Sequence, residues 1–428
     1  MSKMVDNMKG IMRKLFSTGF FHVFGSSVIN KIIAFLSSVV LVRILTKPEY
    51  GTFTYAWNIY SIVFIFSGMG MDSAMLQLAS EHGGEPEYTD KVSKYSVRFG
   101  LWFNLLLAVV LLGIGLWAPL TISGGRNLIF ALCLLPFVQL IVCLMSCYLR
   151  VVKRNQDYAK LTVINTIVVF AGSVGGALLF RELGLVIGQY FAAIVTCLFG
   201  YYSLHVSLMK RSTTSIGEDR KILLKIGFIS MINNGLSQLL LLLDVFVLGI
   251  VDPQETLLAS YKVATMIPTA LIFIPNSLVI YIYPYFAEHK NDGKWCLERF
   301  KKIIIVLGIV NCLISLLLFA FAPTIIRVFF GDQYLDAVPI FRVLSVNYFI
   351  SGTFRIVSGN LLVTQRKLKY NLIESIITSI INVIADYFFI QLWGGMGAAI
   401  ATLMVVIISS IMSTVYLILT FIRVKKNA

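Results

Sequence analysis

The sequence predicts an all-α polytopic membrane protein. Of its 428 residues, 58% are hydrophobic and only 13% are charged, whereas soluble domains hold about 25% charged residues. The mean hydropathy is +0.84. The apolar residues gather in twelve runs, and each run is long enough to cross about 30 Å of hydrocarbon at about 1.5 Å per residue. Because the connectors are short, we expect twelve transmembrane helices and no soluble catalytic domain.

The longest inner connector divides these helices six and six. The first apolar run is too long for a secretory signal and lacks a small-residue cleavage site, so we expect it to remain as a helix. The predicted spans are residues 20–44, 54–79, 98–118, 127–148, 161–180, 186–208, 227–249, 262–287, 303–322, 337–363, 372–392 and 396–422. The predicted domains are a cytoplasmic or interfacial segment (1–19), a first six-helix bundle (20–208), a cytoplasmic connector (209–226), a second six-helix bundle (227–422) and a cytoplasmic tail (423–428).

The lysines and arginines predict the orientation of the spans. With the N-terminus in the cytoplasm, 27 of the 36 basic residues fall in inner segments and 7 in outer segments. Lys31 and Arg355 lie within spans. A bias of this sign in every loop is typical of the positive-inside rule. We therefore expect both termini in the cytoplasm, and we attribute the net charge of +15 to topology rather than to nucleic-acid binding.

An internal duplication would fit the six-and-six division. One alignment of the two halves places Arg154 on Arg366, and a slightly different one places Tyr55 on Tyr261. Since each half contains an even number of helices, both halves would start inside. The repeat would therefore be parallel, with its axis along the membrane normal.

The first span carries a polar stripe on an apolar helix. At about 100° per residue, Ser26, Asn30, Lys31, Ser37 and Ser38 occupy one side of the helix circumference. A lysine at this depth is costly unless it snorkels, pairs with another group or faces a wet cavity. We favour a helix that lines an aqueous cavity.

Three later spans show the same pattern. One stripe alone could serve hydrogen bonding between helices, but four stripes, each with an ionisable residue, favour a shared wet cavity. The stripes contain Ser230, Asn233, Asn234, Ser237 and Asp244 in the seventh span, Asn347, Ser351, Arg355 and Ser358 in the tenth, and Glu374, Ser375, Thr378, Ser379, Asn382 and Asp386 in the eleventh.

The cavity would hold charges of both signs. Its cations suit an anionic substrate group, and arginine can bind a phosphate with two parallel hydrogen bonds. Its carboxylates would neutralise those cations or bind a coupling proton or sodium ion, and the sequence does not choose between these roles. The substrate-binding candidates are Lys31, Arg355, Asn30, Ser38, Lys262, Asn233, Asn234, Asn347 and Ser351, and the ion-coupling or charge-balancing candidates are Asp244, Glu374, Asp386 and Asp72.

No enzymatic or metal-binding motif stands out. Cys143 and Cys147 lie one helical turn apart, but they match no metal-ligand spacing and are interpreted as small core residues. The four histidines are scattered, and there is no GxSxG, P-loop or DxD signature. We expect no catalytic residues, no metal and no cofactor. Pro136, Pro268, Pro275 and Pro284 predict bends in the fourth and eighth spans.

Two segments resemble the bacterial polysaccharide transporter family. LVRILTKPEYGTFTYA (residues 41–56) is similar to that family's first-loop signature, and IIRVFFGDQYLDAV (residues 325–338) to its connector between the ninth and tenth spans. The pattern from Arg154 to Tyr158 and the aspartate Asp244 also fit. This is the Wzx-type branch of the MOP superfamily, which also contains the MATE multidrug exporters and the lipid II flippases.

The resemblance implies two six-helix bundles that form a V around a central cavity. It implies a flippase that moves an undecaprenyl-diphosphate-linked oligosaccharide, an O-antigen or capsule repeat unit, between leaflets of the bacterial inner membrane. The implied partners are that lipid-linked oligosaccharide, membrane lipids and polysaccharide polymerase or assembly proteins. The alternatives are a MATE-like multidrug or cation-coupled exporter, which would favour an acidic cavity, and a membrane polymerase, which would need a larger outer loop than residues 323–339 provide.

Overall fold

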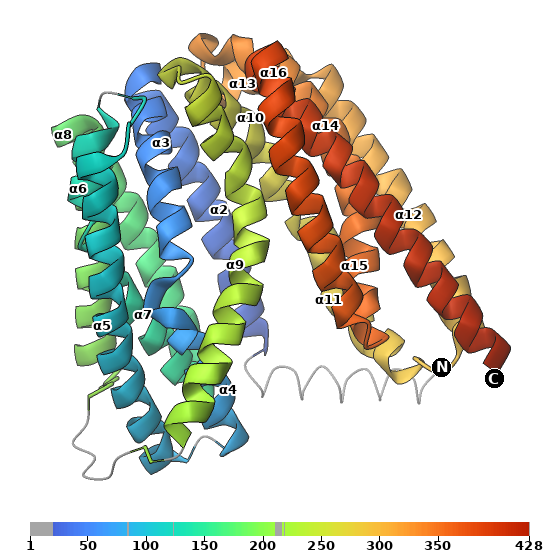
Figure 1. The fold of residues 1–428 in the computed structure, drawn as a ribbon, viewed down its shortest axis with the longest axis horizontal. Helices are drawn as coiled ribbons and strands as arrows, with labels where there is room; N and C mark the ends of the chain where they lie inside the picture. Colours follow the sequence, from blue (N-terminus) through green and yellow to red (C-terminus); the bar gives the residue numbers. More distant parts are fainter. Residues whose placement is uncertain (1–19, 84, 123, 210–215, 218, 428) are drawn as a thin grey trace. The chain divides into compact units, whose positions relative to one another are not determined.

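The computed structural model is helical throughout its described part, with no strand among those residues (Figure 1). It describes residues 20–427 except 84, 123, 210–215 and 218, and it describes no side chains for residues 20–24, 233, 236–237, 240–241, 284, 368 and 426–427. The predicted N-terminal segment 1–19 therefore lies outside the described residues. The elements are α2 (Phe20–Ile44), α3 (Lys47–Phe64), η1 (Ser67–Gly70), α4 (Met71–Glu81), α5 (Pro86–Trp117), α6 (Gly125–Leu132), α7 (Leu135–Val151), α8 (Asn155–Tyr202), α9 (Asp219–Val251), α10 (Glu255–Leu271), α11 (Phe273–Glu288), α12 (Gly293–Ala320), α13 (Ala322–Phe330), η2 (Asp332–Ala337), α14 (Val338–Ile350), η3 (Ser351–Arg355), α15 (Ile356–Thr364) and α16 (Leu368–Asn427).

These helices make the chain a multi-pass membrane protein. Within the described ranges, eight helical segments are long and apolar enough to cross a membrane, and the bent pair α6 and α7 makes a ninth. Each of the twelve predicted apolar runs falls on helices, and α8 and α16 each carry two of them. The predicted all-helical membrane fold is confirmed, and the V-shaped arrangement of two bundles stays a prediction.

Helices α8 and α16 each contain a reversal that involves only two residues. In α8 the helical dihedral angles are interrupted at Phe180 and Arg181. A Cβ atom on Gly184 would collide with the backbone of Gly176. Along a straight helix these two glycines would be separated by about 12 Å, so the chain turns back on itself here. In α16, a Cβ atom on Gly397 would likewise collide with the backbone of an earlier residue across the break, so this helix reverses in the same way.

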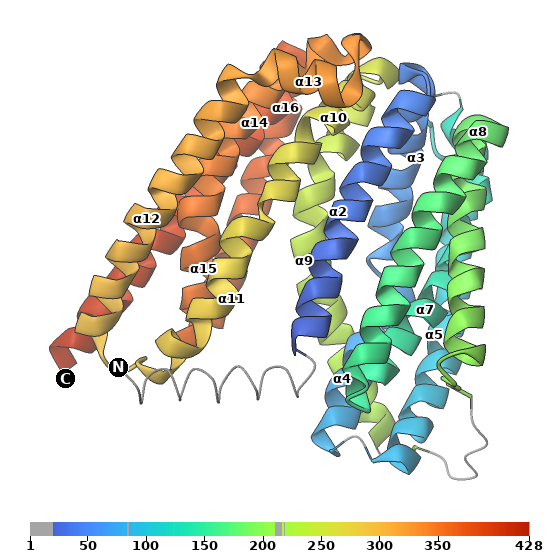
Figure 2. The same ribbon diagram turned by 180° about the vertical axis from the view of Figure 1, so that it is seen from behind.

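The chain divides into two compact units, Met1–Gln238 and Leu239–Ala428. The division falls inside α9 rather than in the predicted connector 209–226. The reason is that the first half of α9 packs closely on the second span: a Cβ on Gly70 would meet the carbonyl oxygen of Gly227, and one on Gly235 would meet Ile65. In this first unit α2 lies along α8 (Figure 2), and the apolar core lies between α4, α5 and α7.

The second unit is built around α12, α14 and α16, which pack on one another (Figure 1). Its apolar core also takes side chains from α11 and α15 and includes Phe286, Phe300 and Phe421.

Several helices are broken within the span. Pro136 lies in the first turn of α7, which meets α6 at 48°. Pro268 and Pro275 flank the break between α10 and α11. The predicted bend at Pro136 is confirmed, whereas at Pro268 and Pro275 the structure shows a one-residue break between two helices. Helix α11 continues through Pro284, whose side chain lies outside the described residues.

The backbone supports an internal repeat, because the two reversals have nearly the same dihedral angles. Phe180 has φ −132° and ψ 18°, and Trp393 has φ −137° and ψ 15°. Arg181 has φ 54° and ψ −133°, and Gly394 has φ 52° and ψ −132°. The second residue of each reversal therefore has a positive φ. We infer that the two turns occupy equivalent positions in the two halves.

The same backbone corrects the register of the repeat. Lys153 and Arg366 both have a φ of 58°, in the turns before α8 and α16. This pair lies in the same register as the two reversals, so the predicted alignment of Arg154 with Arg366 is wrong by one position. The match between two arginine side chains favoured the neighbouring register, whereas the turn geometry sets the true one.

Earlier in each half, two histidines mark equivalent positions. His82 ends α4 and stacks on Tyr88, and His289 ends α11 and stacks on Trp295. Each histidine ring also contacts the backbone carbonyl one turn earlier at 3.0 Å. The number of residues that separates equivalent positions of the two halves is larger after these histidines than at them. The reason is that the second half contains the longer connector α13–η2.

Candidate functional site

The second unit contains a cluster of polar side chains around Asp244 of α9. The Asp244 carboxylate accepts hydrogen bonds from the Tyr261 hydroxyl at 2.7 Å and from the Thr402 hydroxyl at 2.7 Å. The amide of Asn382 donates to its other oxygen at 3.4 Å. Tyr261 is on α10, whereas Asn382 and Thr402 lie on the two arms of α16, before and after its reversal. Four helical segments therefore converge on one carboxylate, and all three donors are neutral.

Asp386 completes this acid cluster. It lies one turn after Asn382, so the two side chains share a face of α16. Asp386 has no exposed surface, and neither of its oxygens has a hydrogen-bond donor among the described residues. The charged group that acts on it is Asp244. Two adjacent carboxyl groups repel each other when both are charged, and burial strengthens that repulsion.

A second cluster joins Arg355 to Glu374. Arg355 ends η3, a short π-helical segment, and the attraction between opposite charges links it to Glu374 on α16. Glu374 is 7% exposed and accepts a hydrogen bond from Ser409 at 2.5 Å. Single-turn π-helical insertions occur often at functional sites. Here the insertion holds an arginine within the span, where its charge is attracted to Glu374 without an ion pair between the two among the described residues.

The polar stripe of the eleventh span faces the interior of the second unit. Glu374, Thr378, Asn382 and Asp386 are all buried, whereas Ile380 and other apolar residues of the same segment are exposed. Their partners lie on neighbouring helices. The described contacts of this stripe are hydrogen bonds between helices around buried carboxyl groups, and the cavity stays a prediction.

In the first unit, the stripe on α2 is divided. Ser26 and Ser37 are buried, and the side-chain oxygen of Asn30 is buried without a donor among the described residues. Ser38 donates to the carbonyl oxygen one turn earlier. Lys31, in contrast, is exposed, and no hydrogen bond or ion pair holds it in the described part of the chain. The helix presents an unneutralised cation while most of its polar residues pack inward.

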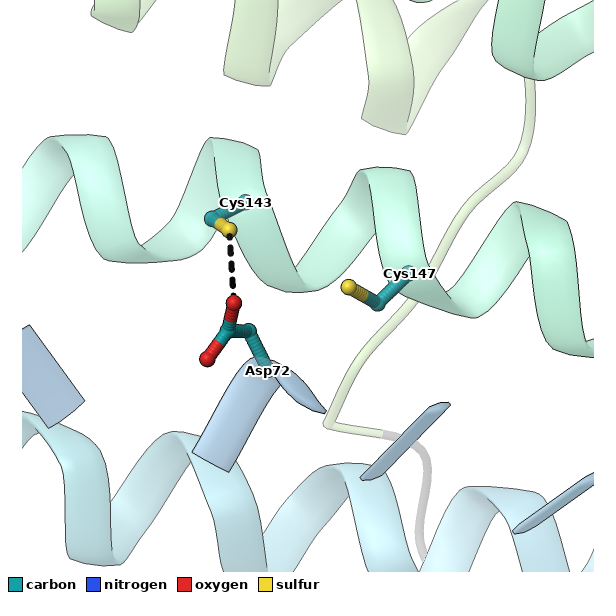
Figure 3. Close-up of side chains that lie close together, drawn as sticks. All are labelled: Asp72, Cys143 and Cys147. Carbon is teal, nitrogen blue, oxygen red and sulfur yellow. Dashed lines mark hydrogen bonds between the residues drawn. The ribbon is translucent and has the colours of Figure 1, made fainter. Parts of the chain in front are cut away.

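Asp72 faces two cysteines, as Figure 3 shows. The Cys143 thiol contacts the Asp72 carboxylate at 3.7 Å, and one ligand atom from each of Asp72, Cys143 and Cys147 lies within 4.8 Å of the others. The cysteines project from one face of α7, and Asp72 lies in the first turn of α4, just after the break at η1. Two thiols and a carboxylate suit a soft divalent metal ion, but a thiol–carboxylate hydrogen bond explains the same contacts.

The remaining predicted residues are dispersed. Asn234 of α9 donates to the Ser73 hydroxyl at 3.4 Å. Lys262 of α10 is exposed, Ser351 is buried in η3, and the side-chain oxygen of Asn347 is buried without a donor in the described chain. The side chain of the remaining candidate, Asn233, lies outside the described residues.

Three members of these clusters are not among the predicted site residues. Tyr261 serves only as a marker of the repeat in the sequence, and Thr402 and Ser409 belong to no predicted stripe. Thr402 interrupts an otherwise apolar segment, residues 396–408, and this isolated polar residue is the available signal. Pairing the segments requires knowledge of the α16 reversal, which the sequence does not reveal.

The chain matches the profile of one known protein family. The family is described as "Polysaccharide biosynthesis protein", and its profile matches residues 16–290. The chain belongs to this family. The match runs from residue 16 through the rest of the first unit and through α11, so it includes Asp244 and Tyr261. The family membership predicted from the two sequence segments is confirmed.

A relative and two structural neighbours agree with this assignment. The Escherichia coli K12 protein described as "Lipopolysaccharide biosynthesis protein WzxC" is 24% identical over 397 residues, which cover 87% of this chain and 75% of WzxC. An inward-facing MATE multidrug transporter of the MOP superfamily superposes with a TM-score of 0.73 at 17% identity. The aligned part covers 93% of this chain and 96% of the transporter chain. The lipid II flippase MurJ, in an inward closed conformation, superposes with a TM-score of 0.72 at 16% identity. The aligned part covers 95% of this chain and 90% of the MurJ chain. These likenesses establish the MOP superfamily fold.

Proposed function

We propose that this family member is a flippase for an undecaprenyl-diphosphate-linked oligosaccharide. It would carry an O-antigen or capsule repeat unit from the inner to the outer leaflet of the bacterial cytoplasmic membrane by alternating access. Both termini would lie in the cytoplasm, and a polysaccharide polymerase or assembly protein would use the product. Support comes from the family match and from the names of two similar proteins, a lipopolysaccharide biosynthesis protein and a lipid II flippase.

The observation that carries the proposal is the presence of cations within the membrane spans. Lys31 is exposed on α2 and Arg355 lies half-buried in η3, while Lys262 is exposed on α10 at the outer end of the predicted eighth span. Charged side chains within a membrane protein are expensive and normally face a substrate or ion pathway. Cations in such a pathway suit a diphosphate, since a phosphate group accepts several charge-assisted hydrogen bonds.

The acid cluster supports coupling to a cation gradient. Asp244 and Asp386 lie together, and the hydrogen-bond donors to the Asp244 carboxylate in the described chain, from Tyr261, Asn382 and Thr402, are neutral. The two carboxyl groups would share one proton or bind one hard monovalent cation such as sodium. Loading the cation would cancel the repulsion between the two carboxylates and so favour one conformation of the second unit over another.

A multidrug exporter is the second candidate. The MATE neighbour and the acid cluster favour it, because acidic groups bind cationic drugs. Lys31, Lys262 and Arg355 favour the flippase, because cations in the pathway repel such drugs. An exporter would retain activity when these cations are neutralised.

A complementation experiment tests the proposal. A strain lacking the gene should lose its surface glycan and accumulate the lipid-linked repeat unit, and the wild-type gene should restore export. Arg355→Ala should abolish export with the protein still present in the membrane, while Arg355→Lys should retain part of it. Arg327→Ala, which removes an exposed arginine paired with Asp332, is the matched control and should export normally. Normal export by Arg355→Ala would remove the main support for an anion site.

A further inference from the structure

The second unit contains a basic pocket whose lining residues belong to neither of the clusters described above. Its volume is about 460 Å³, within the usual range of about 300–1,000 Å³ for small-molecule sites. Three separate segments line it: the turn between α11 and α12, the turn between α15 and α16, and the last turns of α16. It therefore depends on tertiary structure and is not a run of adjacent charges.

The lining of this pocket supplies hydrogen-bond donors and positive charge. Lys290, Arg366, Lys367 and Arg423 contribute four cations, and no aspartate or glutamate is among its described lining residues. None of the four forms an ion pair in the described part of the chain. The amide nitrogen of Gln365 is buried there without an acceptor among the described residues. Such a set of donors suits an anion.

The internal repeat shows that this charge excess is specific to the second unit. In the first unit the equivalent turn holds Arg154, which pairs with Asp157 at 2.8 Å and donates to the carbonyl oxygen of Leu204 at 2.8 Å. In the register set by the backbone turns, Lys367 stands at the position of Arg154, and Tyr370 stands at the position of Asp157. The acid that neutralises the first turn is therefore replaced by a tyrosine in the second.

That tyrosine instead supports a residue that lines the pocket. The Tyr370 ring stacks on Tyr416, with ring centroids 3.7 Å apart and planes 2° apart, and its hydroxyl donates to the carbonyl oxygen of Met412. Tyr416 in turn lines the pocket. The same backbone turn thus carries a satisfied ion pair in one unit and an open, positively charged recess in the other.

We propose that this recess binds the phosphate or diphosphate group of an anion, carried by a lipid headgroup or free in solution. Arginine and lysine are the side chains that bind phosphate oxygens most strongly. The recess lies at the helix ends that hold the inner basic residues of the predicted topology, where anionic headgroups concentrate. The proposal does not depend on the transported substrate, because binding is measured on the purified protein.

The test compares two double variants of the full-length protein. Arg366→Gln with Lys367→Gln removes two cations of the recess, and Lys301→Gln with Lys302→Gln removes two exposed lysines from α12 outside it. Binding of phosphatidylglycerol, phosphatidylcholine and inorganic diphosphate is measured by native mass spectrometry and by titration. The recess variant should bind phosphatidylglycerol or diphosphate about tenfold more weakly or worse, whereas the α12 variant should match the wild type.

The arms of the experiment identify the source of the phosphate. Loss of phosphatidylglycerol binding alone would assign a lipid headgroup, and loss of diphosphate binding as well would assign a site that reads the phosphate itself. Equal weakening in both double variants would overturn the proposal, since the effect would then be general attraction to positive charge. Should the recess variant fail to fold, Arg423→Gln at the exposed end of α16 makes the same comparison, and unchanged binding there would also contradict the proposal.

Discussion

At the scale of single residues, the acid cluster shows how a membrane protein keeps two carboxyl groups buried. Asp244 receives two short hydrogen bonds from hydroxyl groups, whereas Asp386 receives none in the described structure. An unsatisfied buried acid costs free energy that a bound proton or cation would recover. The cost is tolerated where it serves a function, and this asymmetry makes Asp386 the more informative residue to change.

We predict that Asp386→Asn separates stability from activity. The substitution keeps the side-chain shape and removes the repulsion with Asp244, so the thermal unfolding midpoint of the purified protein should rise by a few degrees. Glycan export should fall by about tenfold or more, because the cluster can no longer exchange a cation. Asp332→Asn, an exposed site, should change neither. A lower midpoint with normal export would show that Asp386 is a structural residue.

The sequence revealed the acids of this site but not their grouping. Helical periodicity correctly placed Asn382 and Asp386 on one stripe, since the two residues share a face of α16. It could not show that Tyr261 and Thr402 converge on Asp244. Tyr261 is 17 residues from Asp244 in the sequence and Thr402 is 158 residues from it, and both contacts join different helical segments. Nor could it show whether a polar stripe faces water or another helix, as the α2 and α16 stripes illustrate.

At the scale of elements, the α8 reversal is the feature that hydropathy describes least well. The two apolar runs 161–180 and 186–208 predicted two spans, but they contain no sign that the turn would be completed without a loop. Two features permit it. Arg181 adopts a positive φ of 54° and pairs with Glu49 of α3 at 2.9 Å, and glycines let the two arms meet backbone to backbone.

We predict that Gly184→Ala destabilises the protein strongly. Its Cβ would collide with the backbone of Gly176 across the hairpin, and overpacking of this kind costs about 1–3 kcal/mol. Gly175→Ala on the same helix is the matched control, because its Cβ would meet nothing within 4 Å. The measurement is the thermal midpoint and the monodisperse yield in detergent. If both variants behave alike, the close approach of the two arms is not a packing constraint.

At the scale of the whole molecule, the sequence predictions rest on two patterns that run along the entire chain, the internal repeat and the distribution of positive charge. The positive charges alternate through every loop, and the predicted topology, which stays a prediction, rests on that alternation. The repeat was recognisable, but its register was off by one because the similar side chains of Arg154 and Arg366 outweighed a turn that only backbone angles reveal. The longer connector formed by α13 and η2 also changes the spacing between equivalent positions partway through each half.

The topology itself yields a direct prediction. In a cysteine-free background, single cysteines in residues 209–226 should be shielded from a membrane-impermeant thiol reagent in intact cells. Cysteines near Asp252 or Asp332 should be labelled. Permeabilising the cells should expose the first group and provides the control for reactivity. The reverse labelling pattern would contradict the predicted orientation.

The decisive experiment for the proposed function is transport by the purified protein. The lipid-linked repeat unit that accumulates in the deletion strain would be reconstituted into proteoliposomes, and its movement between leaflets would be followed with a sugar-modifying enzyme confined to one side. We predict faster translocation than in protein-free vesicles, further acceleration by a proton or sodium gradient, and loss of that acceleration in Asp386→Asn. Translocation no faster than in protein-free vesicles would contradict the proposed function.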